Sequence, residues 1–233
     1  DNMWLEAELK ICDAYFALKD FKKLSEKYRQ IITAVDSVSA DSEYMVPALF
    51  KMGKNLAALN ENELAQRAYE KIIKLSKSPR NLSNAKYRLA LIFFESKNYD
   101  KCLAACDELM GQKDTGGNAF SPFELGNLKG RAKSAIADYD GALAIFDGIL
   151  SSDGAPEHIR LQTRFNKAMV YNDKKEYSKA IENFELLASD AQDVEMLAKT
   201  HYLLGCAYYA INNVDEAIKN LLKVEILFKD TAT

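Results

Sequence analysis

One eight-residue pattern recurs six times along the chain at nearly constant intervals. Each copy opens with Phe, Tyr, Asn or Val, has a small or apolar residue at its fourth position and mostly ends on an aromatic residue. The intervals between copies are 41, 37, 40, 38 and 37 residues, measured between the fourth residues Leu24, Ala65, Cys102, Ala142, Ala180 and Ala217. A period of this length is typical of a stacked array of helical hairpins, in which no repeat can bury its apolar face alone.

A second set of small residues precedes the first by twelve positions, at Cys12, Gly53, Ala90, Gly130, Ala168 and Gly205. Large and mostly aromatic residues lie nine positions before the first set, at Tyr15, Leu56, Phe93, Lys133, Tyr171 and Tyr208. Two antiparallel helices pack about 8–10 Å apart, and where they cross most closely only a small side chain fits. We therefore expect each repeat to contain a first and a second helix that cross at the two small residues.

These spacings resemble those of the tetratricopeptide repeat family along nearly the whole chain. The best copies are RFNKAMVYNDKKEYSKAIENF (164–184) and HYLLGCAYYAINNVDEAIKNL (201–221), whereas Leu24, Cys102 and Lys133 depart from the family's pattern. The resemblance implies an all-α fold, a right-handed α-solenoid superhelix of about six helical hairpins. It implies a single array over residues 1–233, with repeats at about 5–40, 46–78, 83–113, 123–152, 161–190 and 198–230.

Serine, proline and glutamate mark several expected helix starts. Ser121-Pro-Phe-Glu124 reads as a capping box with proline at the first helical position, and Ser78-Pro79 starts a helix in the same way. Pro47 belongs in a first turn, which predicts a helix start near Met45. The intervals exceed the 34 residues of the usual repeat. We therefore expect either longer connections between repeats, of which 111–122 is the longest, or an extra helical turn in the first helix.

Composition and charge exclude several classes of protein. The chain is 48% hydrophobic and 28% charged, as in folded globular proteins, and its net charge of −3 comes from interleaved acids and bases. Because no basic patch is visible, we expect no nucleic-acid binding. We also expect no membrane insertion, because the longest apolar run, 89–94, is far shorter than the roughly 18 residues of a membrane span. The sequence begins without signal-peptide features. Free, buried thiols favour a reducing compartment, so the expected location is the cytoplasm, with the periplasm or export as the alternative if an upstream signal was removed.

No residue cluster indicates catalysis, a metal site or a cofactor. The cysteines at 12, 102, 106 and 206 form no CxxC motif, and His158 and His201 are far apart in sequence. The cysteines occupy helix-packing positions, so we expect reduced, slowly reacting thiols. We expect no enzyme activity and no cofactor.

In the family that this chain resembles, the first helices line a concave surface where partners bind. The residues expected on that surface are mainly aromatic and basic: Phe16, Phe50, Lys54, Tyr87, Arg88, Phe94, Arg131, Phe165, Tyr202 and Tyr209. Two interpretations stay open for the rings at 50, 87, 165 and 202. They either line an exposed groove for a peptide or helix, or pack against the preceding repeat.

The resemblance also raises a specific alternative, a clamp that holds an acidic carboxy-terminal tail. Asn127, Arg131, Asn166 and Lys199 stand at clamp-like positions, but Leu203 occupies a place where the clamp needs a cation.

The expected function is a non-catalytic scaffold that binds a partner protein or peptide. The alternative is a structural element that self-assembles through its open ends. We expect the carboxy-terminal end to need a cover, because Val224, Leu227 and Phe228 follow the sixth repeat.

Overall fold

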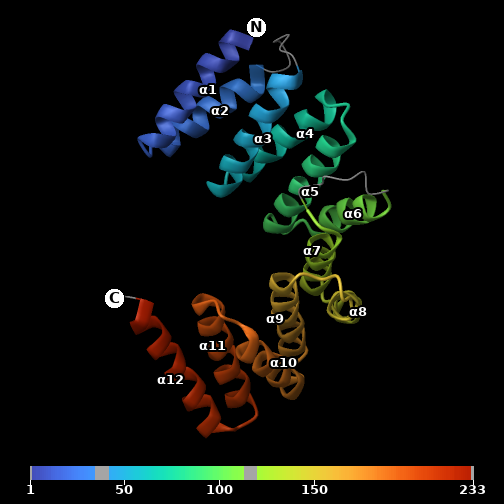
Figure 1. Ribbon diagram of the computed structural model, residues 1–233, viewed down its shortest axis with the longest axis vertical. Helices are drawn as coiled ribbons and strands as arrows, with labels where there is room; N and C mark the ends of the chain where they lie inside the picture. Colours follow the sequence, from blue (N-terminus) through green and yellow to red (C-terminus); the bar gives the residue numbers. More distant parts are fainter. Residues whose placement is uncertain (1, 35–41, 113–119, 232–233) are drawn as a thin grey trace. The chain divides into compact units, whose positions relative to one another are not determined.

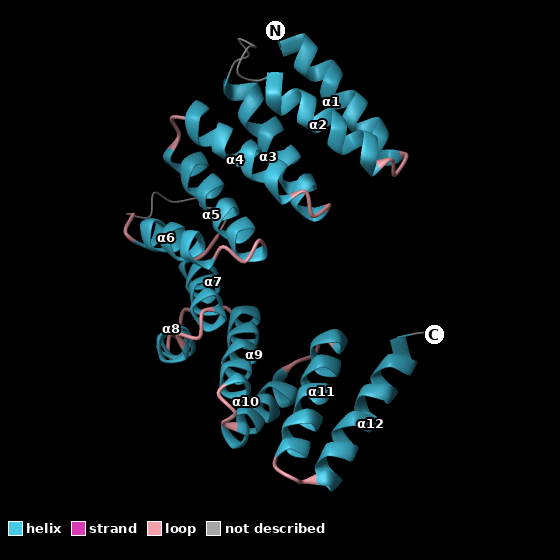
Figure 2. Ribbon diagram, turned by 180° about the vertical axis from the view of Figure 1, so that it is seen from behind, coloured by secondary structure: helices cyan, strands magenta, loops and turns pink. Residues whose placement is uncertain are grey.

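The computed structural model describes residues 2–34, 42–112 and 120–231, and these form twelve α-helices and no strand (Figures 1 and 2). The helices are α1 (Asn2–Ala17), α2 (Phe21–Ala34), α3 (Ser42–Ala58), α4 (Asn62–Leu75), α5 (Pro79–Glu95), α6 (Tyr99–Met110), α7 (Pro122–Ala135), α8 (Tyr139–Leu150), α9 (Glu157–Asp173), α10 (Tyr177–Asp190), α11 (Val194–Ala210) and α12 (Val214–Thr231). The all-α fold class expected from the sequence is confirmed.

Successive helices pack as six hairpins, α1 on α2 through α11 on α12. The chain divides into two compact units of three hairpins each, Asp1–Ser121 and Pro122–Thr233. Within each unit the second helix of one hairpin also contacts the first helix of the next, as α4 contacts α5 and α10 contacts α11. Both units are therefore short α-solenoids.

The helix starts explain the long intervals between repeats. The helices α3, α5, α9 and α11 have 17 residues each, and they begin at residues 42, 79, 157 and 194. Each start lies about one turn before the beginning of the repeat expected from the sequence. The additional residues thus form an extra turn at the beginning of the first helix.

The predicted proline starts are confirmed at two of three places. Pro79 and Pro122 are the first residues of α5 and α7, and the Ser78 side chain accepts a hydrogen bond from the Asn81 backbone N–H. The prediction for Pro47 was wrong, because α3 begins at Ser42 and Pro47 lies inside it. The extra turn precedes the proline there, and the helix continues although one backbone donor is missing.

The small residues twelve positions before each second-helix residue are all buried at helix crossings. A Cβ atom added to Gly53 would lie 2.6 Å from Cζ of Tyr69, and one added to Gly205 would lie 2.7 Å from Cγ of Leu221. In each case the contact is with the residue four positions after the small residue of the second helix. The register inferred from the sequence therefore places the crossings correctly.

All six hairpins turn through the same backbone path. A non-glycine residue with φ between 55° and 62° follows each first helix at an equivalent place: Lys19, Asn60, Lys97, Ala137, Lys175 and Asn212. The next residue donates its backbone N–H to the carbonyl five residues earlier, as Asp138 does to Lys133 at 2.9 Å. This is the Schellman motif, which satisfies carbonyls at a helix end.

The same residue that closes the turn also begins the second helix. It is acidic or asparagine in every hairpin: Asp20, Glu61, Asn98, Asp138, Glu176 and Asn213. The Asp138 side chain accepts from the Gly141 backbone N–H at 3.0 Å, and Asn98 caps α6 in the same manner. Asp20 and Asn213 also cap their second helices, whereas Glu61 and Glu176 form no side-chain cap. The turn therefore caps the first helix in every hairpin and the second helix in four of the six.

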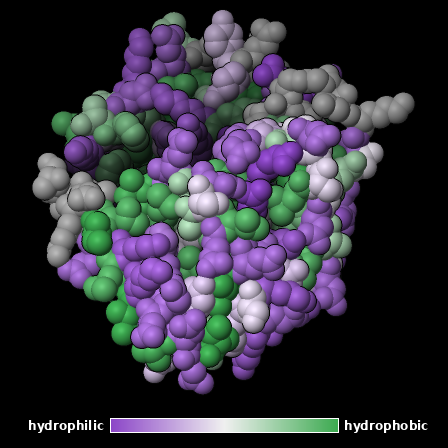
Figure 3. Space-filling view, turned by 60° about the horizontal axis from the view of Figure 1, so that its bottom comes forward, coloured by the Kyte–Doolittle hydropathy of each residue, from purple (hydrophilic) through white to green (hydrophobic). Residues whose placement is uncertain are grey.

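The last second helix, α12, exposes an apolar stripe composed of Val214, Ile218, Leu221, Leu222 and Ile226. The residues of α10 that match Ile218 and Leu221 are Ile181 and Phe184, which are buried because α11 packs on α10. Figure 3 brings forward the end of the chain with α12 and shows apolar residues (green) at the surface among hydrophilic ones (purple). Val224 and Leu227 are half-buried, and the side chain of Phe228 lies outside the described part of the chain.

The core of each unit is formed by the facing sides of its hairpins. One cluster in the first unit joins all three hairpins, from Leu5 of α1 to Ile92 of α5. In the second unit, Phe146 and Phe184 are buried in separate clusters, each beside the crossing of its own hairpin. Within the residues described, no helix is both long and apolar enough to cross a bilayer.

Candidate partner-binding faces of the first helices

The ten residues expected to bind a partner all lie on first helices, but their exposure differs. Phe16, Lys54, Tyr202 and Tyr209 are exposed, whereas Phe50, Arg88, Phe94, Arg131 and Phe165 are half-buried. Tyr87 is buried, with 9% of its surface exposed. The structure therefore distributes these residues over two faces, one on each unit, with different chemistry.

The four rings at equivalent positions do not form a regular row of open rings. Phe50 and Phe165 contact the aromatic residues of their own second helices, Tyr69 and Phe184, each with ring centroids 6.1 Å apart. The ring of Tyr87 stacks on Phe120 at 4.5 Å. Tyr202 alone among the four is mostly open, with 56% of its surface exposed.

Phe120 explains why Tyr87 is buried, and the comparison of repeats in the sequence missed it. Phe120 lies in the segment between two repeats and matches none of the aligned repeat positions. Alignment of the repeats therefore could not indicate that an aromatic ring covers Tyr87. A covering aromatic can be recognised only once the chain path before α7 is known.

In the second unit, Tyr202 lines an apolar groove between α11 and α12. The groove has a volume of about 510 Å³, and its walls are Val194, Glu195, Ala198, Lys199, Tyr202, Val224 and Leu227. The charged pair at its edge, Lys199 and Glu195, is held by an ion pair of 2.6 Å. Tyr202, Cys206 and Tyr209 follow one another at helical spacing, and all three are exposed. This face offers aromatic and apolar surface with one reactive group, the Cys206 thiol.

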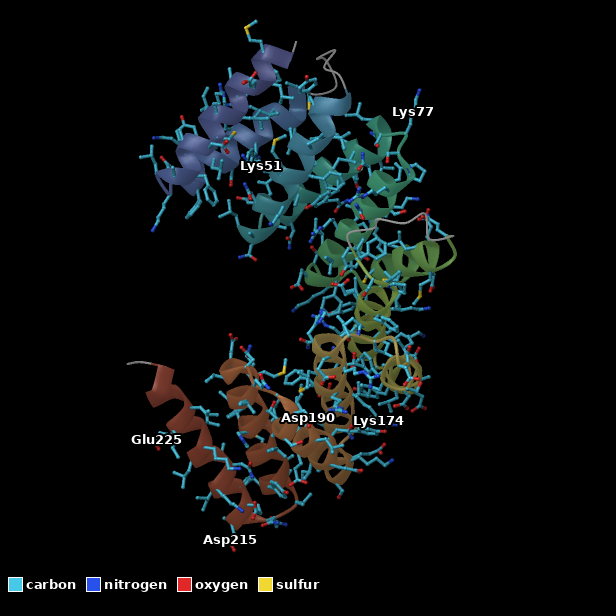
Figure 4. All side chains as sticks on the ribbon, viewed as in Figure 1. Lys51, Lys77, Lys174, Asp190, Asp215 and Glu225 are labelled. Carbon is cyan, nitrogen blue, oxygen red and sulfur yellow. The ribbon has the colours of Figure 1, made fainter. Side chains whose placement is uncertain are left out.

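In the first unit, the corresponding face carries positive charge. Lys54 of α3 and Arg88 of α5 have no ion pair with any residue that the structure describes. Lys51 of α3, labelled in Figure 4, pairs with Asp13 of α1. Lys54 and Arg88 are therefore the cations of this face whose charge is available to a ligand.

The clamp-like residues are bound to one another or to neighbours in the second unit. The Asn166 side-chain amide donates to Oδ1 of Asn127 at 2.6 Å, which joins α9 to α7. Asn127 is buried, and Lys199 is paired with Glu195. The Asn166–Asn127 bond therefore stabilises the packing of α9 on α7, whereas the Lys199–Glu195 pair lies within α11.

His201 and three of the four cysteines occupy structural environments, whereas His158 and Cys206 are exposed. His201 Nδ1 lies 2.9 Å from Oδ1 of Asn220, and burial lowers the pKa of His201 below its ordinary value. Cys12, Cys102 and Cys106 are buried thiols outside any disulfide, as expected, but Cys206 is exposed, which the sequence did not lead us to expect. Cys206 follows the small residue Gly205 directly and therefore points away from the crossing. Among the residues described, no three His, Cys, Asp or Glu side chains cluster in a way that suits a metal ion.

Comparison with known families and structures gives one consistent result. Residues 50–116 match one family model of the tetratricopeptide repeat, and residues 161–189 and 198–225 match another. Together, these matches make up more than half of the chain. Comparison with curated proteins gives no match.

Several solved structures share the fold at low sequence identity. A tetratricopeptide repeat protein from Parabacteroides merdae aligns with a TM-score of 0.66 at 14% identity, covering 95% of this chain and 78% of that one. The apo form of RapI aligns with a TM-score of 0.67 at 16% identity, covering 80% and 71%. MamA from Desulfovibrio magneticus aligns with a TM-score of 0.61 at 15% identity, covering 81% and 98%.

Proposed function

Because the chain belongs to the tetratricopeptide repeat family, we propose that it is a non-catalytic scaffold that binds a segment of a partner protein on its first helices. Stacked repeats present extended surfaces, and partner binding is the general use of such surfaces. The exposed ring of Tyr202 beside an apolar groove is the observation that carries this proposal most directly.

The α11 face supplies what an interface needs at its centre. A tyrosine ring is fixed by two rotatable bonds, so its ordering on binding costs little entropy, and aromatic residues are enriched among the residues that carry interface energy. The groove next to Tyr202 is lined by Val194, Ala198, Val224 and Leu227. An apolar side chain of the partner fits there, with Tyr202 and Tyr209 on one side of the bound segment.

A photo-crosslinking experiment tests this proposal and captures the partner in the same step. The photoreactive residue benzoylphenylalanine replaces Tyr202 in the full chain, and the control replaces Leu186, which is exposed on the second helix α10. We expect a specific crosslinked protein at Tyr202 and none at Leu186. The purified partner is then titrated against wild type, Leu186→Ala and the double variant Tyr202→Ala/Tyr209→Ala.

The double variant should bind at least about tenfold more weakly, while Leu186→Ala binds as wild type does. Both tyrosines are exposed, so the double variant should keep its fold. Tyr87 does not suit this test, since its ring is packed on Phe120. Equal affinity of all three proteins would exclude the α11 face as the binding surface.

Self-assembly through the ends of the array is a second candidate, supported by α12. Leu222 and Ile226 are exposed at positions where all five other second helices carry charged residues, Ser, Thr or Gly. At the opposite end, Ala7, Ile11 and Ala14 of α1 are exposed, although the matching residues of α5 are buried. Sedimentation velocity over a wide concentration range tests this alternative. Association that Leu222→Glu abolishes would support it, and a monomer at all concentrations would refute it.

We propose the cytoplasm as the location, with the periplasm or export as the alternative. The four cysteines are thiols outside any disulfide, which favours a reducing compartment.

A further inference from the structure

The hydroxyl group of Tyr69 lacks the partner that an equivalent tyrosine has. Tyr28 and Tyr69 occupy the same position in α2 and α4, and the Tyr28 hydroxyl accepts a hydrogen bond of 2.9 Å from the Asn55 side-chain amide. One hairpin further on, Ile92 stands in the place of Asn55 and cannot donate or accept. No described residue forms a hydrogen bond with the Tyr69 hydroxyl, although only 2% of the surface of Tyr69 is exposed.

The crossing of α3 and α4 determines where the hydroxyl group of Tyr69 lies. The Tyr69 ring lies under Gly53, where an added Cβ would approach Cζ to 2.6 Å, so the ring passes through the space that the glycine leaves. It reaches a pocket of about 130 Å³ lined by Lys54, Ala57, Asn60, Asn62, Tyr69, Arg88, Leu91, Ile92 and Glu95. This volume equals that of roughly four water molecules in the liquid, which suits a carboxylate group.

The charges around this pocket favour an anion. Lys54 and Arg88 approach it from α3 and α5, and neither forms an ion pair with a described residue. Glu95 is the acid of the lining, so the three charged side chains together carry one net positive charge. Burial raises the pKa of Tyr69 and the charge of Arg88 opposes that rise, so the hydroxyl stays protonated at neutral pH and lies within the field of Arg88. A protonated hydroxyl can donate one hydrogen bond.

We propose that Lys54, Arg88 and the Tyr69 hydroxyl form a subsite for a carboxylate of the bound partner segment. The two cations supply charge-assisted hydrogen bonds, and the hydroxyl supplies a donor from the floor of the pocket. Phe50 precedes Lys54 by one helical turn, so an acidic residue in this subsite lies next to an apolar residue of the partner. The inference rests on the proposed function, because the carboxylate belongs to a partner segment bound on first helices, in this case those of the first unit.

Small carboxylates test the subsite directly and need no identified partner. The full chain, with its tyrosine rings labelled with carbon-13, is titrated with N-acetyl-glutamate N-methylamide at constant ionic strength. N-acetyl-glutamine N-methylamide is the neutral control, and N-acetyl-alanine presents a terminal carboxylate instead of a side-chain one. Tyr69→Phe identifies the ring signal of Tyr69, and the Tyr28 signal serves as an internal reference because its hydroxyl is already bonded.

We expect a saturable shift of the Tyr69 signal with millimolar affinity for the glutamate compound and none for the glutamine compound. Arg88→Gln and Tyr69→Phe should each weaken binding of the glutamate compound about fivefold or more. Because Tyr69→Phe removes the reporting ring signal, its affinity is measured from the backbone amide signals. Tighter binding of N-acetyl-alanine would indicate the carboxylate of a chain end as the natural ligand. Tighter binding of N-acetyl-glutamate N-methylamide would indicate an acidic side chain.

The inference is overturned if the glutamine compound shifts Tyr69 equally, if no saturable shift occurs, or if Arg88→Gln leaves the affinity unchanged. Lys54→Gln provides a second variant should Arg88→Gln unfold. Because the readout does not involve Tyr202, a negative result leaves the proposed binding face on α11 untouched. A failure of crosslinking at Tyr202 likewise leaves the carboxylate titration interpretable.

Discussion

The ring of Phe146 lies directly against the backbone of Gly130, so that a Cβ atom on Gly130 would fall 2.4 Å from Cε1 of Phe146. Phe146 is fully buried, so its ring has neighbours on every side. The α7–α8 crossing therefore depends on the absence of a single carbon atom, and the same relationship joins Gly53 to Tyr69 in the first unit.

Gly130→Leu should cost more than about 2 kcal/mol in the free energy of unfolding, because the new side chain overpacks the crossing. Gly148→Leu is the matched control, since Gly148 lies in α8 with no atom within 4 Å of an added Cβ. The control should be neutral or slightly stabilising, because leucine favours helix more than glycine does. Urea unfolding of both variants measures the difference, and equal stabilities would show that the crossing can adapt.

Ala137→Asn should stabilise the second unit by about 0.5–1 kcal/mol, because alanine is strained at its φ of 62° and asparagine tolerates this conformation better. The reverse change, Asn212→Ala, should destabilise the equivalent turn of the last hairpin by a similar amount. Thermal unfolding measures both. A lower melting temperature for Ala137→Asn would mean that the turn does not limit stability.

Cys206 should react much faster than the other three cysteines. Cys12, Cys102 and Cys106 are buried, and burial raises the pKa of Cys12 to about 11, so its reactive thiolate is scarce at neutral pH. Native protein treated with Ellman's reagent should show one fast thiol and three that react only on unfolding. Cys206→Ser should remove the fast phase and Cys102→Ser should not. A fast phase that survives in Cys206→Ser would contradict the burial pattern.

Stability should fall as the pH drops below about 6.5 through one histidine. Burial lowers the pKa of His201 in the folded chain, so the unfolded chain takes up the proton first as the pH falls through the ordinary value of 6.5. The stabilisation is therefore complete above that value and is lost as the pH falls toward the folded pKa. Unfolding measured at pH 7.5 and pH 5.5 should show a smaller difference for His201→Asn than for wild type. An identical pH dependence would assign the effect to other groups.

The sequence predicted the features that rest on packing between helices in one hairpin. The small residues Gly53, Gly130 and Gly205 recur because close contact at the crossing forbids larger side chains, and this constraint is local and periodic. The start of α3 lies earlier than predicted, because the helix adds a turn before Pro47. A proline lacks one backbone donor and crowds the turn before it, so it makes an earlier helix start costly but does not forbid one.

The candidate site was less predictable, because it depends on exceptions to the repeat. The burial of Tyr87 comes from Phe120, a residue outside the repeat, and the open hydroxyl of Tyr69 comes from isoleucine at position 92. The acidic or asparagine residue that begins each second helix was missed, although it is visible in the sequence at Asp20, Glu61, Asn98, Asp138, Glu176 and Asn213. Aligning that column would have identified the turn.

In the turn that all six hairpins share, the path of the backbone does not depend on the charge of the side chain at the left-handed residue. The left-handed residue is lysine in the first, third and fifth hairpins and uncharged in the second, fourth and sixth, yet the hydrogen bonds around it are the same. The geometry is therefore maintained by the backbone, and the side chain at this place is free to vary. The ends of neighbouring hairpins can thus differ in electrostatic character without any change in how their helices meet, which allows the surface to be altered while the scaffold is kept.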